Sequence, residues 1–470
     1  MHFDFAFTYN PVCRQAGLPP CTLTSLYFLL TLYIIIFVKT NATQIIILGI
    51  FILFLIVGVL VFSKFSGSTA SDSNPIQIQV WGTVPDSTFS NLVQSINSTS
   101  VGAVNVAYTE VQEDVFEQTL IEALADGVGP DVVLIPNTLL LKNQKKFTLI
   151  GNDILSTRDF KDTFIEGSEF LLTSKGTYGI PFYVDPLVMY WNRDILTSKN
   201  VARPPTTWEE ILLLASTITE RRDDRSIIKS TVALGDYSNV QYAKEILLSL
   251  VMQSGGSFVG RDSDDRPINL LDGSIGGDRS DFFTSAMSFF TQFSDPLKPV
   301  YSWNRSLPKS QQAFINGDLA FYFGYASDAF EIRAKNPNLN FDIADFPQPK
   351  NSPTKVSAGT IYSFSILATS QNQNASYINI LALAGQQSGS ILSSISGLPS
   401  ARRDLLSLLP GTSFGDVFWR SALRTRAWLD PNPIQTGIIF ANSVNDAVTG
   451  KSKSSDAARL ASRQITELLR

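Results

Sequence analysis

Residues 131–136 read DVVLIP, a continuous apolar run that is typical of a strand buried on both faces of a parallel sheet. Residues 76–81 alternate Ile and Val with Gln, as a half-buried strand does, and residues 104–108 form a further short strand. Two helical patterns, at residues 85–97 and 113–126, lie between these three strands. Strands and helices that alternate in this way predict an α/β lobe.

The remainder of the chain continues this alternation. Residues 207–210 (TWEE) form a capping box that begins a helix, residues 319–323 and 357–369 have strand patterns, and residues 457–469 form an amphipathic terminal helix. The 470 residues are enough for two lobes, each with its own core. Because ligands of such sheets bind beyond the carboxyl ends of the strands, we expect a site after Trp81 and the ends of the neighbouring strands.

Histidine and cysteine are nearly absent from the chain. The single histidine is His2, and the two cysteines, Cys13 and Cys21, precede the apolar segments near the N-terminus. The body that follows therefore has no thiol and no imidazole, which excludes Cys/His nucleophiles, zinc sites and disulfides there. We expect no metal and no cofactor.

The charge pattern and the glycine motifs exclude further classes. The formal net charge is −5 and the chain has no long Lys/Arg cluster, so nucleic acid is not an expected partner. No GxxxxGK[ST] motif is present, and Gly127-x-Gly129 lacks the third glycine of a dinucleotide fingerprint. These absences argue against an ATPase or a nucleotide-binding domain.

Two apolar runs precede the body. Residues 45–62 are uncharged and long enough to span a bilayer, so we expect a transmembrane anchor there, followed by a flexible linker at 63–75. No Ala-x-Ala-like site follows directly, which favours a retained anchor over a signal peptide. Residues 23–38 are marginal, and two interpretations stay open: a second apolar span, or an upstream extension over 1–37, because Val38 would be a normal start if it were a GTG initiator.

Four stretches, taken in order, resemble the family 1 extracellular solute-binding proteins, the class that includes maltose-binding protein. They are IQIQVWG with GVGPDVVLIP, YGIPFYVDPLVMYWNRDIL (residues 178–196) with PPTTWEEI, QQAFINGDLAFYFGY, and LDPNPIQTGIIFANSVNDAVTGK. The resemblance covers the chain from about Ile76 to Arg470. It implies a two-lobed periplasmic-binding-protein fold, type II-like, whose hinge crossovers let the lobes close on a solute.

The family resemblance also implies a function. It is that of a non-catalytic capture module that delivers a small solute, with a sugar favoured, to the permease subunits of an ABC importer. We expect a monomer whose body lies on the extracytoplasmic face of the plasma membrane behind a single-pass anchor. Two alternatives stay open: a tethered sensor that presents its ligand to a membrane receptor, and a glycoside-active enzyme that uses two carboxylates.

The resemblance places three crossovers, near Val184–Leu187, after Gly324, and near Gly359. A glycine can absorb a large change in φ and ψ at a strand end, and the alternative is that Gly324 and Gly359 are ordinary turn glycines. The expected lobes are residues 76–184 with 325–359, and residues 185–324 with 360–470.

Sugars are bound by aromatic faces that stack on the ring and by carboxylates and amides that bond the hydroxyls. On this basis, and by the resemblance, the expected solute ligands are Trp81, Thr83, Asn137, Tyr183, Asp185, Trp303, Tyr325 and Trp428. For each tryptophan, core packing is the alternative. The last family stretch has no aromatic residue before Phe440, which puts a large oligosaccharide in doubt.

Overall fold

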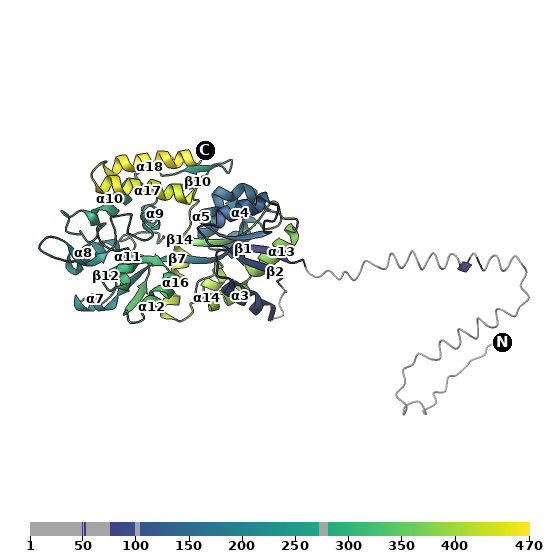
Figure 1. Cartoon of the computed structure of the whole chain (residues 1–470), viewed down its shortest axis with the longest axis horizontal. Coiled ribbons are helices and arrows are strands. Elements are labelled where there is room, and N and C mark those ends of the chain that lie inside the picture. Colours follow the sequence, from purple (N-terminus) through teal and green to yellow (C-terminus); the bar gives the residue numbers. More distant parts are fainter. Residues whose placement is uncertain (1–48, 50, 53–75, 99–103, 272–280) are drawn as a thin grey trace, which may run out of the picture. The chain divides into compact units, whose positions relative to one another are not determined.

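The computed structural model describes residues 49, 51–52, 76–98, 104–271 and 281–470 (Figure 1). The chain divides into two compact units, residues 1–74 and 75–470. The apolar run at 23–38 lies outside the described residues, as do all but three residues of the run at 45–62. Among the residues that are described, no helix is long and apolar enough to cross a membrane. The transmembrane anchor therefore stays a prediction.

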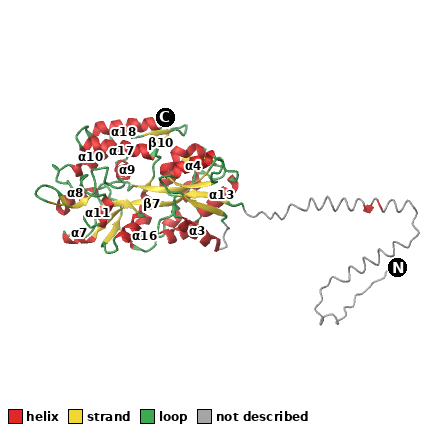
Figure 2. Ribbon diagram, viewed as in Figure 1, coloured by secondary structure: helices red, strands yellow, loops and turns green. Residues whose placement is uncertain are grey.

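A ten-stranded sheet forms the centre of the second unit, which we call the body. Its strands follow the order β2-β1-β3-β14-β7-β12-β9-β8, with β13 also paired to β7 and β15 to β14. The strands are β1 (Ile78–Gly82), β2 (Val106–Glu110), β3 (Val132–Pro136), β7 (Ile180–Asn192), β8 (Glu220–Arg221), β9 (Ile227–Val232), β12 (Leu319–Tyr325), β13 (Phe341–Ala344), β14 (Ser357–Ile366) and β15 (Thr425–Arg426). Figure 2 shows β7 in the middle of this sheet.

Helices cover the sheet on both faces. The helices of the described body are α3 (Asp86–Ser98), α4 (Phe116–Ala125), α5 (Asn137–Asn143), α6 (Thr157–Thr163), α7 (Arg193–Ser198), α8 (Trp208–Ile218), α9 (Ala243–Gln253), α10 (Phe282–Thr291), α11 (Ser310–Ile315), α12 (Asp328–Lys335), α13 (Gln373–Leu383), α14 (Gln386–Ser396), α15 (Arg403–Leu406), α16 (Ser413–Arg424), α17 (Pro433–Val448) and α18 (Ser454–Leu468). Two small sheets add β4 (Ile150–Gly151), β5 (Leu172–Thr173) and β6 (Gly176–Thr177), and β10 (Val259–Arg261) with β11 (Pro267–Asn269).

The elements predicted from local patterns are present. All five residues of β3 are buried, as the apolar run predicts for a central strand. The three opening strands pair in parallel, with β1 between β2 and β3. The capping box is confirmed, because the Thr207 hydroxyl accepts from the Glu210 amide and the Glu210 carboxylate accepts from the Thr207 amide.

The 13-residue strand β7 joins the two lobes. Its first half pairs with β14, from Ile180 to Pro186, and its second half pairs with β12 and β13, from Leu187 to Asn192. We call the half of the body that contains β1–β3 lobe 1, and the half that contains β9 and β12 lobe 2. The β7 strand therefore changes partner between Pro186 and Leu187.

The other two crossovers differ from the predicted positions. The β13 strand pairs with the half of β7 that belongs to lobe 2. The end of β14 pairs with β3 of lobe 1. The next two helices also contact lobe 1, α13 through β1 and α14 through α3. The chain returns to lobe 2 between α15, which contacts α6, and α16, which contacts β7 and β13. Residues 325–359 thus lie mainly with lobe 2, and β14 to α14 with lobe 1, the reverse of the predicted division. Strand patterns show that a segment is extended and buried, but they do not show where it changes partner.

Candidate functional site

The junction of the lobes carries two tyrosines on neighbouring strands. Tyr183 of β7 and Tyr362 of β14 are in register across the sheet, and their rings stack with centroids 4.4 Å apart and planes 7° from parallel. Burial is the largest cause that raises the pKa of each hydroxyl. Both phenols therefore stay protonated at neutral pH and can donate hydrogen bonds.

Two polar residues lie on the same sheet face, two positions along each strand. Asp185 of β7 is in register with Thr360 of β14, and alternate residues of a strand point to the same face. The Asp185 carboxylate accepts a hydrogen bond of 3.1 Å from the amide of Ser327. Burial raises the pKa of Asp185 to about 7, although the hydrogen bonds from Ser327 oppose the shift. The raised pKa favours the protonated carboxyl, which can donate a hydrogen bond as well as accept one.

Lobe 2 supplies two more tyrosines. The Tyr325 hydroxyl accepts a hydrogen bond of 3.0 Å from Thr360, and the Tyr242 ring lies 4.5 Å from that of Tyr325. Tyr242 has a left-handed backbone (φ +57°) at the residue before α9, and its hydroxyl donates to Asp328 at 3.0 Å. We call Tyr183, Tyr242, Tyr325 and Tyr362 the tyrosine cluster. It spans the junction from β14 to the start of α9.

The loop before α9 approaches α17 at Tyr237. Glu245, in the first turn of α9, is half-buried, and its charge acts on both Tyr237 and Tyr325. A Cβ atom at Gly437 of α17 would lie 3.9 Å from the Tyr237 hydroxyl.

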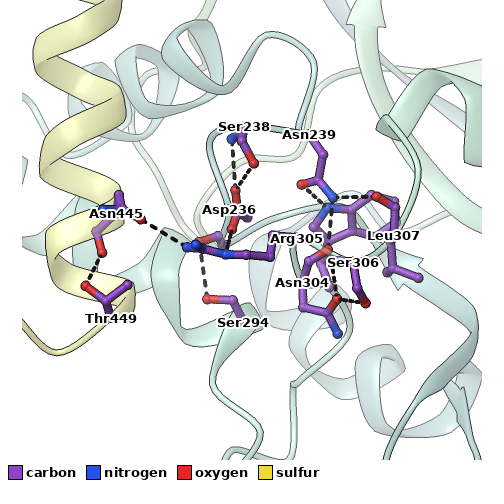
Figure 3. A network of polar contacts seen from close by, with 12 residues as sticks. Asp236, Ser238, Asn239, Ser294, Asn304, Arg305, Ser306, Leu307, Asn445 and Thr449 are labelled. Atoms are coloured by element: carbon purple, nitrogen blue, oxygen red, sulfur yellow. Dashed lines mark hydrogen bonds and ion pairs between the residues drawn. The ribbon is translucent and has the colours of Figure 1, made fainter.

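A network of polar contacts fixes the loop that carries Tyr237 and Tyr242. Figure 3 shows Arg305 between Asp236, at 3.4 Å, and Asn445 of α17, at 3.0 Å. In the same network the Asn239 amide donates to the carbonyls of Asn304 and Leu307. These contacts tie three separate segments of lobe 2 together, so the loop has a defined position.

The arrangement suits the capture of a polar, uncharged ring better than catalysis. Aromatic faces and hydroxyl or carboxylate groups alternate across the junction, which is the chemistry that recognises sugars. No set of three metal-ligating side chains comes together in the described parts of the chain. The buried carboxylates Asp185 and Asp328 are held by Ser327 and by the hydroxyls of Tyr242 and Tyr322, a role that positions the cluster.

Of the predicted ligands, Tyr183, Asp185 and Tyr325 come together in this site. Asn137 is buried at the start of α5, where its amide nitrogen donates to the carbonyl of Trp428 at 3.0 Å and its oxygen accepts from the amide of Ile361 at 3.1 Å. Asn137 thus joins lobe 1 to the crossover strand, which favours a structural role over solute binding.

The two tryptophans predicted in lobe 2 pack in its core. Trp303 is 1% exposed, and its indole nitrogen donates to Asn239 at 2.9 Å. Trp428 packs against Phe258, with the ammonium of Lys244 lying 5.6 Å from its ring centroid. Neither ring belongs to the tyrosine cluster.

Trp81 and Thr83 are half-buried at the carboxyl end of β1, the strand end where a ligand was predicted. They remain candidates for contacts from lobe 1. Neither belongs to the tyrosine cluster.

The predicted hinge residues have different roles. Val184 is fully buried on the crossover strand, whereas Gly324 is within β12, paired with Val188 inside lobe 2. Gly359 of β14 is at a crossover, where a Cβ atom would lie 2.6 Å from Thr425 Cγ2 and 3.1 Å from the Asp185 carbonyl. Neither glycine has a positive φ. The glycine at 359 is explained by the lack of space for a side chain beside Thr425, and not by a backbone conformation that only glycine adopts.

Sequence reasoning missed Tyr362, Thr360, Tyr242 and Glu245. For the first two a signal existed: Thr360 and Tyr362 alternate within the predicted strand 357–369, directly after the predicted crossover glycine. Tyr242 and Glu245 follow no recognisable local pattern, because their place depends on the loop network of lobe 2.

Comparison with known proteins identifies the family. The sequence model of the bacterial extracellular solute-binding proteins matches residues 83–387, more than half of the chain. The chain belongs to this family. A binding protein of Brucella abortus (strain 2308) is 27% identical over 110 residues, which are 23% of this chain and only 26% of that relative. The resemblance stated from the sequence is confirmed.

Solved structures of solute-binding proteins share the fold. A cyclo/maltodextrin-binding protein complexed with maltotetraose matches with a TM-score of 0.67 at 16% identity, over 85% of this chain and 99% of that chain. The sugar-binding protein MalE from Xanthomonas citri matches with a TM-score of 0.65 at 20% identity, over 84% and 97% of the two chains. The predicted α/β two-lobed periplasmic-binding fold is thereby confirmed.

Proposed function

We propose that this solute-binding protein captures a hydroxyl-rich solute, a carbohydrate, at the tyrosine cluster and delivers it to an ABC importer. One observation carries the proposal: Tyr183 and Asp185 of β7 are in register with Tyr362 and Thr360 of β14 at the junction of the lobes. Aromatic faces and hydroxyl-bonding groups thus meet where both lobes can touch one ligand. The solved relatives in complex with sugars, such as maltotetraose, support the same ligand class.

The proposed role is non-catalytic. The body has no histidine and no cysteine, and the buried carboxylates of the junction are engaged by hydrogen bonds. The partners we propose are a sugar and the permease subunits of the importer, with the protein acting as a monomer.

A thermal-shift screen tests the ligand class. The full chain, kept in a mild detergent, is heated with neutral sugars, polyols, amino acids and dipeptides. A sugar at one hundred times its dissociation constant should raise the free energy of unfolding by about 2.7 kcal/mol. Shifts produced only by amino acids or peptides would refute the carbohydrate proposal.

The proposed location is the extracytoplasmic face of the plasma membrane, behind the anchor at 45–62. The uncharged apolar run in the sequence supports it. Protease added to intact cells should digest the body, and alkaline carbonate should leave the chain in the membrane fraction. Protection equal to that of a cytosolic control would contradict this location.

A further inference from the structure

A hydrogen-bonded contact joins the two lobes outside the strands that cross between them. The turn between β10 and β11 carries Asp265, whose carboxylate accepts from the Ser174 amide, at 3.0 Å to each oxygen, and also from the Ser174 hydroxyl. Ser174 lies in the turn between β5 and β6. Beside this contact, Arg261 Nη2 donates to Gln144 Oε1 at 2.8 Å. We call the two contacts, Asp265 with Ser174 and Arg261 with Gln144, the latch.

The two sides of the latch belong to different lobes. On one side, β6 leads into the lobe 1 half of β7, and the nearby Thr148 amide donates to the carbonyl of Ile366, where β14 pairs with β3. On the other side, Asn269 of β11 donates to the Thr466 hydroxyl of α18 at 2.8 Å, and α18 contacts α17 of lobe 2. A rotation of one lobe against the other therefore acts on the latch.

The turn that carries Asp265 is itself held by a latch residue. Asp265 has a left-handed backbone (φ +63°), a conformation that aspartate adopts more readily than most other residues. Arg261 Nη1 donates to the Asp265 carbonyl at 2.9 Å, while its Nη2 reaches Gln144. Because one guanidinium fixes the turn and contacts lobe 1, the two contacts of the latch are coupled.

The lobe 1 side of the latch starts on the face of the crossing strands that points away from the tyrosine cluster. Successive residues of a strand point to opposite faces, so Ile361 points away from the face of Tyr362. The 3₁₀ helix at Glu166–Leu171 lies on the Ile361 face, because a Cβ atom at Gly167 would lie 3.3 Å from Ile361 Cδ1. This helix leads directly into β5 and then into the turn with Ser174. The tyrosine cluster and the start of the latch thus lie on opposite faces of the junction.

The lobes are loosely packed beside the latch. A cavity of about 270 Å³ lies there, lined by Phe170 and Leu172 of lobe 1 and by Phe258 and Arg261 of lobe 2, among others. A void deprives the side chains around it of dispersion contacts. The hydrogen bonds of the latch therefore supply a large share of the attraction between the lobes on this face.

We propose that the latch stabilises the open form of the protein and breaks when the lobes close over the tyrosine cluster. A rotation about β7 and β14 that brings the lobes together on one face of these strands separates them on the other face. The affinity for a solute is reduced in proportion to the fraction of molecules that are closed and able to bind it. Weakening the latch should therefore raise the affinity for any solute, although no contact to the solute changes.

The distance between the lobes of the solute-free protein tests the latch. The full chain in mild detergent carries Cys13→Ser and Cys21→Ser, so that spin labels attach only at Asp114→Cys and Ile438→Cys. Asp114 is exposed beyond the carboxyl end of β2, and Ile438 is exposed on α17 beside the contact with Tyr237. Because ligands of such sheets bind beyond the carboxyl ends of the strands, closure should shorten this distance, which pulsed electron paramagnetic resonance measures.

Two variants remove the latch from opposite sides. Asp265→Gly removes the carboxylate and suits the left-handed backbone, so the turn should be kept. The ratio of molecules at the shorter distance to molecules at the longer one should rise about threefold to tenfold. Gln144→Ala should shift the ratio in the same direction by a smaller factor. Asp264→Gly, in the same turn, is the control, because its carboxylate pairs with Arg266 of the same hairpin, and it should keep the wild-type ratio.

Two results would overturn the proposal. A shift to the longer distance in Asp265→Gly would mean that the latch stabilises the closed form. An unchanged ratio in both Asp265→Gly and Gln144→Ala would mean that the latch does not control the lobes. Since the measurement contains no solute, its result does not depend on the proposed carbohydrate function.

Discussion

The tryptophans of lobe 2 and the tyrosines of the junction are two groups of aromatic residues in different environments: the first lie in a core and the second lie where the two lobes meet. Trp303 is buried with its indole nitrogen bonded to Asn239, and Trp428 is buried against Phe258 and the ammonium of Lys244. Tyr183 and Tyr362 stack at the crossover of two strands, beside a carboxylate and a hydroxyl. The difference teaches that ring size alone does not identify a ligand platform. An aromatic residue that binds the solute also needs a polar group on its ring and a position where the two lobes meet.

The largest effect is expected for Trp303→Ala. The side chain is 1% exposed, so its removal leaves a cavity and an Asn239 oxygen without its donor. The free energy of unfolding should fall by about 3–5 kcal/mol, measured by urea denaturation. At a temperature where the variant is folded, its sugar affinity should equal that of the wild type. A loss below about 1 kcal/mol would mean that this region is less well packed than the structure indicates.

Gly359→Ala should have the next largest effect. A Cβ atom there would approach Thr425 Cγ2 to 2.6 Å, so the crossover strand must shift. Overpacking of this kind costs about 1–3 kcal/mol of unfolding free energy. Adding Thr425→Ser, which removes the methyl group, should restore part of the loss in a double-mutant cycle. Strict additivity of the two substitutions would contradict the contact.

Asp185 gives the junction a pH dependence that the tryptophans lack. Burial raises its pKa to about 7 in the folded protein, from an ordinary value of 3.8. Between about pH 4 and pH 7 the folded state therefore holds a proton that the unfolded state has lost. This group makes the free energy of unfolding fall as pH rises through that window and level off above it. Asp328, with a pKa raised to about 6 by burial, contributes in the same direction.

The comparison of wild type with Asp185→Asn isolates this contribution. The variant amide can still accept from the Ser327 amide, so the fold should be kept. The free energy of unfolding of the variant should exceed that of the wild type by an amount that grows from pH 4 to pH 7. Urea denaturation at each pH measures this difference. A difference that does not change with pH would show that Asp185 is ionised in the folded protein throughout.

The smallest effect is expected for Tyr362→Phe. The stacked ring is kept and only the hydroxyl is lost, which removes a net contribution of about 0.5–1.5 kcal/mol. Sugar affinity should fall severalfold, measured by calorimetry, with little change in stability. A loss as large as that of Tyr362→Ala would mean that the hydroxyl, and not the ring face, dominates recognition.

The fold could be predicted from the sequence to the extent that it is local. The apolar run of β3, the alternation of β1 and the capping box at Thr207 each depend on neighbouring residues, and all are present. The division of the middle segments between the lobes could not be predicted, because β7 and β14 are buried on both sides of the junction, with only Trp191 and Tyr362 half-buried. A pattern that shows burial does not show a change of partner.

The site could be predicted only in part, for the same reason. Tyr183 and Asp185 lie on a strand that resembles the family's crossover, so the sequence named them. Tyr362 needed the register between β7 and β14. Trp303 and Trp428 were predicted as ligands because a tryptophan in a core and one in a cleft have the same local sequence pattern.

The central claim is that the tyrosines at the junction bind the solute and that the tryptophans of lobe 2 only stabilise the protein. Calorimetric titration of a binding sugar into three variants tests it directly: Tyr362→Ala, Trp428→Phe, and Tyr377→Ala on α13 as a control outside the cluster. We predict an affinity reduced at least tenfold in Tyr362→Ala, on the order of 1.4 kcal/mol or more, and unchanged in the other two. Wild-type affinity in Tyr362→Ala with a large loss in Trp428→Phe would contradict the account.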